Sequence, residues 1–257
     1  MSPAAYRATT LRVLRQLLAD PRTVALILVV PTALLTLLYF VFLDVPAPPL
    51  PPGEPSSAAG FPRIALTMLG VLPMVVMFLV TSVAMQRERN SGTLERLWTT
   101  PIHRLDLIAG YCTAFAATAV VQSLILCGVA FWFLGVETRG SVLWVLVVAA
   151  VDAVVGIALG LFTSAFSRSE FQAVQFMPLV VGPQLFLCGL FVPADSMPRV
   201  LEWLSRIMPM TYAVDALGAI RDTTGVTGIF LLDLAILVGF GLAALALSAL
   251  TMPRRTA

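Results

Sequence analysis

The sequence predicts an all-α integral membrane protein with six transmembrane helices. Hydrophobic residues make up 59% of the 257 residues and charged residues only 12%, whereas soluble domains are about 45–50% apolar and about 25% charged. Six apolar segments are each long enough to cross the hydrocarbon core, which takes about 20 helical residues. A densely charged run, residues 86–104, lies between the second and third of these segments.

Residues 3–20 predict an amphipathic helix that is too polar to span a membrane. One side carries Tyr6, Thr10, Val13, Leu14, Leu17 and Leu18 at helical spacing. The opposite side carries Arg12, Arg15 and Gln16. We expect an interfacial helix whose arginines face anionic head groups; the alternative is a frayed basic tail.

The six predicted spans cover residues 23–43, 64–85, 105–134, 142–166, 171–192 and 229–250. Pro31, Pro73 and Pro178 lie inside three of them, where proline kinks or breaks a helix. The proline-rich residues 44–62 favour extended polyproline conformation and predict an external loop. Residues 193–228 predict two short apolar helices, separated at Pro209, that re-enter the outer leaflet.

The distribution of arginines predicts the orientation. Six spans place both termini on one side, and the segments on that side hold eleven arginines against five on the other. Because cytoplasmic loops carry the excess of basic residues, we expect both termini and residues 86–104 to be cytoplasmic.

The composition also disfavours several classes of function. All sixteen basic residues are arginine, and a phosphate-binding P-loop requires a lysine, so an ATPase would have to be another chain. Cys112, Cys127 and Cys188 fall in apolar segments without metal-ligand spacing. No metal cluster or nucleophile–base pair is evident, which makes an enzyme the least favoured class.

The charged run has an internal order, QRERNSGTLERLWTTPIHR. A basic–acidic cluster leads into a Ser-Gly turn, and a short helical repeat then ends before Pro101. We interpret this repeat as a short helix that passes force from a cytoplasmic partner to the membrane part. The alternative is a solvated interfacial turn.

Two stretches resemble the ABC-2 type permeases, the membrane subunits of ATP-binding-cassette exporters. Residues 88–101 are similar to the pattern ExExGTxExLxxTP, with Asn90 as one departure, and residues 188–217 to SGxFxPxxxMPxxLxxLxxxxPxTYxxDxL. Within the family, the chain most resembles the daunorubicin-resistance-type drug-export permeases. The resemblance implies one ABC-2 type transmembrane domain over residues 1–257.

The resemblance also implies roles for individual residues. A coupling helix within residues 86–104 would rest in a cleft of a separate ATPase subunit. The implied coupling residues are Glu88, Gly92, Thr93, Leu94, Glu95, Arg96, Leu97, Trp98 and Pro101. The implied residues of the external re-entrant region are Pro193, Met197, Pro198, Pro209, Tyr212 and Asp215.

The same resemblance implies the partners. ATP and Mg²⁺ would bind the ATPase subunit, and this chain would bind neither a cofactor nor a metal. The permease would pair with a second copy or a sister permease in the bacterial cell membrane, in contact with lipid and with no nucleic acid.

Polar residues inside the predicted spans are candidates for a substrate pathway, because they are rare there and often functional. They are Gln122 and Ser123 in the third span, Asp152 in the fourth, and Gln175 and Gln184 in the fifth. Facing one cavity, they would contact a cationic amphiphile. Alternatively, Asp152 only stabilises packing, and Asp233 of the sixth span lies at the head-group level.

The sequence therefore predicts a permease that exports a hydrophobic or amphipathic cargo, such as a drug, an antibiotic or a lipid-like molecule. A lipid or polysaccharide exporter of the same family is an alternative. An ion-coupled secondary transporter using Asp152 and Asp233 is a second, although the six spans show no clear inverted repeat. A membrane scaffold without transport is a third.

Overall fold

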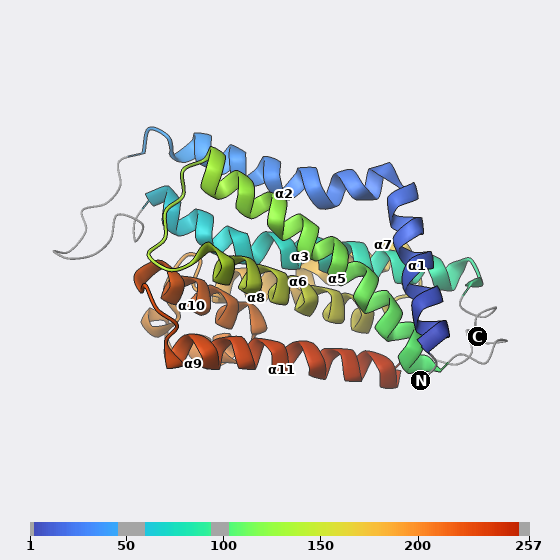
Figure 1. Ribbon diagram of the computed structural model, residues 1–257. Helices are drawn as coiled ribbons and strands as arrows, with labels where there is room; N and C mark the ends of the chain where they lie inside the picture. Colours follow the sequence, from blue (N-terminus) through green and yellow to red (C-terminus); the bar gives the residue numbers. More distant parts are fainter. Residues whose placement is uncertain (1–2, 46–59, 94–102, 252–257) are drawn as a thin grey trace.

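The computed structural model describes residues 3–45, 60–93 and 103–251, which contain helices and no strand. Within these ranges, five helices are long and apolar enough to cross a membrane. They are α2 (Pro21–Phe42), α3 (Gly60–Asn90), α5 (Arg104–Gly128) with its π-helical extension η2 (Val129–Phe133), α6 (Val142–Ser164) and α11 (Gly228–Thr251). Figure 1 shows these helices side by side in one bundle.

The predicted fifth span is formed as two shorter helices, α7 (Glu170–Val180) and α8 (Gly182–Leu187). The chain breaks between them because Pro183 supplies no backbone N–H and follows a glycine. The helices have 11 and 6 residues, and a crossing takes about 20, so neither could span alone.

Two ends of the bundle can be distinguished, and we name each after a helix. At the α1 end, α1 (Pro3–Ala19) turns sharply from the axis of α2, and α3, α6 and α11 all finish there (Figure 1). At the α10 end lie η3 (Ala194–Ser196), α9 (Arg199–Arg206) and α10 (Pro209–Asp222). The pair α7–α8 begins beside α3 at the α1 end and reaches α10 at the other, where the Met210 N–H donates to the Gln184 side-chain oxygen Oε1 at 3.4 Å.

Helix α3 is longer than the predicted span of residues 64–85. It begins at Gly60, since Pro62 falls in its first turn, where the missing N–H costs nothing. It continues to Asn90 because Gln86, Glu88 and Arg89 are buried against other helices. Gly92, with φ of +68°, then ends the helix in the left-handed conformation that glycine adopts readily. The first part of the charged run is thus helix, and the predicted Ser-Gly turn follows it.

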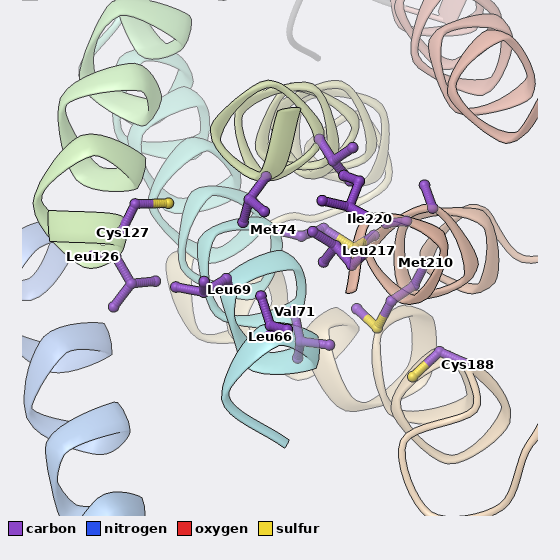
Figure 2. Close-up of a cluster of buried hydrophobic side chains, with 14 of the residues drawn as sticks. Leu66, Leu69, Val71, Met74, Leu126, Cys127, Cys188, Met210, Leu217 and Ile220 are labelled. Atoms are coloured by element: carbon purple, nitrogen blue, oxygen red, sulfur yellow. The ribbon is translucent and has the colours of Figure 1, made fainter. Parts of the chain in front are cut away.

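The hydrophobic core is organised around α3. In the larger of two clusters, α3 contributes Leu66, Leu69 and Met74, which meet Leu217 of α10 and Cys127 of α5 (Figure 2). The smaller cluster lies nearer the α1 end and joins Val13 and Leu17 of α1 to residues of α3, α5 and α6. Helix α2 has far fewer buried residues than α3. The centre of the bundle is therefore α3.

Helix α6 approaches the backbone of α3 through two glycines. A Cβ added at Gly156 would lie 2.3 Å from the Met74 carbonyl oxygen, and one at Gly160 would lie 2.6 Å from that of Phe78. Small residues let membrane helices approach closely in this way. Gly239 of α11, in contrast, has no atom within 4 Å of its added Cβ.

We expect Gly156→Ala to destabilise the protein, because the new methyl group meets a backbone oxygen that belongs to a buried helix. Overpacking of this kind typically costs about 1–3 kcal/mol. Thermal unfolding of the detergent-purified full chain measures the loss. Gly239→Ala is the matched control, and it should leave the midpoint unchanged or raise it, since alanine favours helix. Equal effects of the two substitutions would contradict the close contact.

Candidate functional site

The end of α3 at the α1 end is the most highly connected polar site in the described part of the chain. Three consecutive residues, Arg87, Glu88 and Arg89, reach different neighbours, and we call them the α3 hub. Residues 94–102, which follow shortly after, hold most of the predicted coupling helix. The contacts of the hub therefore join the start of the charged run, residues 86–104, to the membrane bundle.

Glu88 joins α3 to α1 through Arg12. Both Glu88 carboxylate oxygens accept hydrogen bonds from Arg12 Nη1 at 3.2 Å, and Arg12 Nη2 donates to the Tyr111 hydroxyl of α5 at 2.6 Å. Glu88 is only 9% exposed. Burial alone would lower the pKa of Arg12, but Tyr111 and Glu88 outweigh it, and the pKa of Arg12 is raised. A single charged residue thus links three helices.

The prediction that Arg12 faces lipid head groups is therefore wrong. Its side chain turns inward because the buried Glu88 carboxylate needs a charged partner. The stripe of α1 that faces the bundle is Thr9, Val13 and Leu17. Leu18, predicted for the same side, is 71% exposed.

Arg87 joins α3 to two further elements. Its Nε donates to Glu170 Oε2 in the first turn of α7 at 2.9 Å, and its Nη1 lies 3.9 Å from Asp20 Oδ2. Asp20 caps α2 by accepting from the Thr23 hydroxyl and from the backbone N–H groups of Thr23 and Arg22. These hydrogen bonds lower the pKa of Asp20, and the one from the Thr23 hydroxyl has the largest effect. Arg87 therefore contacts both the α1–α2 corner and the start of α7.

Arg89 joins α3 to the end of α6. Its Nη1 donates to the Ser164 carbonyl oxygen at 2.9 Å, and the side chain is buried. The last carbonyls of a helix have no partner within the helix, so Arg89 satisfies a group that would otherwise need water. Through its three residues, the hub contacts α1, α6, α7 and the cap of α2, and Arg12 extends this network to α5.

A cavity of about 490 Å³ lies beside the hub. Helices α1, α2, α3 and α5 line it with apolar side chains such as Leu17 and Phe115, and Arg87 and Glu88 stand on its wall. Thr93, the last residue described before the gap, also lines it.

The structure covers only part of the predicted coupling segment. Glu88 lies in the hub, Gly92 ends α3, and the Thr93 and Ser91 hydroxyl oxygens are 2.8 Å apart. Outside the described residues lie Leu94, Glu95, Arg96, Leu97, Trp98 and Pro101. The coupling helix itself stays a prediction.

The predicted pathway residues do not all face one interior space. Asp152, Gln122 and Ser123 are buried, and the side-chain oxygens and nitrogen of these three have no hydrogen-bond partner within the described chain. Gln184 is also buried, but it holds α8 against α10 through Met210. Gln175 is exposed on α7. Gln184 therefore has a hydrogen bond that explains its burial, whereas Asp152, Gln122 and Ser123 have no such side-chain hydrogen bond within the described residues.

At the α10 end, Arg206 gathers the polar residues of the predicted re-entrant region. Its Nη1 donates to Asp215 Oδ2 at 3.0 Å and its Nη2 to Asp195 Oδ1 at 2.8 Å. The Tyr212 hydroxyl donates to the Arg206 carbonyl oxygen at 2.7 Å. Burial raises the pKa of Asp215, and Arg206 opposes this shift. Tyr212 and Asp215 thus lie together, as two members of one cluster.

The other predicted residues of this region stand at helix boundaries. Pro193 and Met197 flank η3, Pro198 caps α9, and Pro209 opens α10. Proline is favoured at such positions because its φ is already helical and its N–H is not needed. Helix α9 exposes an apolar face, with Val200 78% and Trp203 76% exposed.

Sequence reasoning missed Arg12, Arg87, Arg89 and Arg206 as members of these sites. Arg12 and Glu88 are 76 residues apart, so no helical spacing connects them. The available signal was physical: a carboxylate next to a long apolar helix requires a charged partner, and arginine is the only strong cation in the sequence.

Comparison with known proteins identifies the family. The family model described as ABC-2 type transporter matches residues 4–220, from α1 through most of α10. The chain belongs to the ABC-2 type transporter family. The matched region includes the α3 hub and the Arg206 cluster. The resemblance predicted from residues 88–101 and 188–217 is confirmed, and with its five long apolar helices this ABC-2 type chain is a multi-pass membrane protein.

Three relatives of this ABC-2 type chain are named as permeases. The probable multidrug ABC transporter permease YbhS of Escherichia coli is 25% identical over 197 residues, covering 76% of this chain and 50% of the relative. The linearmycin resistance permease protein LnrN of Bacillus subtilis is 28% identical over 199 residues, which cover 74% of this chain and 49% of the relative. The probable doxorubicin resistance ABC transporter permease protein DrrC of Mycobacterium tuberculosis is 28% identical over 138 residues, which cover 53% of this chain and 50% of the relative. The matches span about half the length of each relative.

Proposed function

We propose that this chain is the permease subunit of an ATP-driven exporter that moves a hydrophobic or amphipathic cargo outward. The observation that carries the proposal is the α3 hub, which ties the start of the predicted coupling loop to α1, α6 and α7. Family membership supports it, because ABC-2 permeases work with an ABC ATPase subunit. The names of LnrN and DrrC support a drug or antibiotic as cargo.

The chain crosses the membrane six times in this proposal. The five long helices supply five crossings, and α7 with α8 supplies the sixth as a broken helix. Both termini and the α1 end are cytoplasmic, in agreement with the excess of arginine there. Exposed Trp132, Phe133 and Trp203 near the α10 end fit the aromatic belt of the outer interface.

The external region then re-enters the outer leaflet through α9 and α10. The exposed apolar face of α9 supports this, because Val200, Leu201 and Trp203 would contact lipid rather than water. Arg206, paired with Asp195 and Asp215, holds the region together on its polar side.

Coupling proceeds from the loop to the bundle. The ATPase subunit binds ATP and Mg²⁺, and its closure moves the loop as a rigid body. Through Glu88 the motion reaches α1 and α5, and through Arg87 and Arg89 it reaches α7 and α6. Packed helices respond to such a displacement by shifting between discrete arrangements. Two copies, or a copy and a sister permease, supply the two loops that a pair of ATPase subunits requires, in the bacterial cell membrane.

The coupling assignment is tested by changing the charge at two positions in the loop, one acidic and one apolar. We expect Glu95→Arg and Leu97→Asp each to abolish co-purification of the ATPase subunit with this chain, and with it ATP-dependent efflux. Glu54→Arg is the matched control, because it makes the same charge reversal in the predicted external loop and should leave both unchanged. If both loop variants still co-purify with the ATPase subunit and still support efflux, the coupling assignment is wrong.

A further inference from the structure

A second cavity, of about 430 Å³, lies at the α10 end. The start of α3, the segment after α8, α10 and the start of α11 line it. Its apolar walls include Leu66, Val214, Leu217 and Ile229. Sites for small molecules commonly measure about 300–1,000 Å³ and combine apolar walls with a few placed polar groups, so this cavity could hold an amphiphile.

The polar groups on the wall comprise four aspartates and three arginines. Arg206 pairs with Asp195 and Asp215. Arg221 donates two hydrogen bonds to Asp222, at 2.7 and 2.8 Å. Arg63 is partly exposed, so water can solvate its guanidinium group.

The fourth aspartate, Asp233, differs from the other three. It is only 7% exposed, and its Oδ2 has no hydrogen-bond partner among the described residues. A buried carboxylate without a partner is costly, and such groups in membrane helices commonly mark substrate pathways. A cationic hydrogen-bond donor would satisfy this oxygen and balance its charge.

We propose that this cavity binds an amphiphile that carries an ammonium group, with Asp233 as the carboxylate that receives it. The ammonium N–H donates to Oδ2, and the apolar body lies against Leu66, Leu217 and Ile229. The inference rests on the proposed export function, to which it adds the class of cargo. A cavity at the α10 end, external in that proposal, would hold the cargo before its release.

Doxorubicin is a suitable probe, because it is fluorescent and carries one primary amine, on the sugar attached to its aromatic ring system. N-acetyl doxorubicin, in which the amine is neutral, is its matched partner. Binding is titrated by fluorescence on the full chain in dodecyl maltoside, an uncharged detergent. We expect doxorubicin to bind at least about tenfold more tightly than the acetylated form, the size expected of one charge-assisted hydrogen bond.

Substitution at Asp233 assigns that difference to the site. Asp233→Asn should remove the preference for the amine and leave binding of N-acetyl doxorubicin unchanged. Asp233→Glu should retain the preference for the amine. Glu137→Gln is the control, because it removes one exposed charge at the same end of the bundle but outside the cavity wall. Equal affinity of the wild-type chain for the two probes overturns the inference, as does a preference that survives Asp233→Asn.

A lipid amine offers the same chemistry as a cargo amine, and competition distinguishes them. Displacement of doxorubicin by phosphatidylethanolamine, but not by phosphatidylcholine, supports the ammonium site with lipid as its occupant. Failure of both lipids to displace it supports the site with cargo as the occupant. These titrations contain no ATPase, so a negative result overturns the cavity assignment alone, whereas the Glu95→Arg experiment overturns the coupling assignment alone.

Discussion

Arg12→Ala is expected to loosen α1 from the bundle and to abolish ATP-dependent efflux. The substitution leaves the Glu88 carboxylate, whose side chain is 11% exposed, without its charged partner, and it also removes the donor to Tyr111. Breaking a fully buried ion pair costs about 3–5 kcal/mol, and since the Arg12 side chain is 27% exposed we expect about 2 kcal/mol. The variant should therefore still fold, but with a less fixed link between α3 and α1.

A double-mutant cycle separates the pair from its surroundings. Arg12→Met and Glu88→Leu should each lower the midpoint of thermal unfolding, whereas the double variant should recover most of the loss, because no unpaired charge remains. The coupling free energy should lie between about 1 and 3 kcal/mol. Efflux in vesicles that contain the ATPase should stay low in the double variant, since the polar link between the helices is absent.

Arg15→Ala is the matched control for this cycle. Arg15 lies on the same helix and is exposed, so its loss should change neither stability nor efflux, because isolated surface charges contribute little. Equal effects at Arg12 and Arg15, or strictly additive effects of the two partners, would show that the contact does not join α1 to α3.

The helices could be predicted from the sequence because their signals are local. Hydropathy and periodicity place α1 at residues 3–20 and α11 at residues 229–250, within one residue of the observed Pro3–Ala19 and Gly228–Thr251. The same signals fail at the end of α3. There the run of charged residues predicts the start of a loop, but residues 86–90 are helical because they form ion pairs with distant helices.

The sites were less predictable, because their contacts join residues that are distant in the sequence. Gln184 was a reasonable pathway candidate, since amides are rare in apolar segments, but its partner is a backbone N–H 26 residues away. Tyr212 and Asp215 were both assigned to the external re-entrant region by resemblance. Arg206, which connects them, lies across the break at Pro209, where no helical periodicity extends.

Asp152 is a buried carboxylate whose presence should lower the stability of the fold. It lies on the buried face of α6 with 0% exposure, and neither carboxylate oxygen has a hydrogen-bond partner in the described ranges. An unsatisfied buried polar group typically costs about 1–3 kcal/mol, and more when it is charged. A packing role predicts a hydrogen bond to a neighbouring helix, which is the contact that these oxygens lack.

Asp152→Val is therefore expected to raise the stability of the fold by about 1–3 kcal/mol, because valine is close to aspartate in volume and removes the unsatisfied oxygens. Efflux should be lost, since residues kept at a cost in stability are commonly kept for function. Thermal unfolding and vesicle efflux of the same preparation measure both effects. Thr163→Val is the control on the same helix: its hydroxyl already donates to the Leu159 carbonyl oxygen, so no gain in stability should follow. A less stable Asp152→Val would contradict the cost assigned to the two unsatisfied oxygens, and unchanged efflux would remove Asp152 from the pathway.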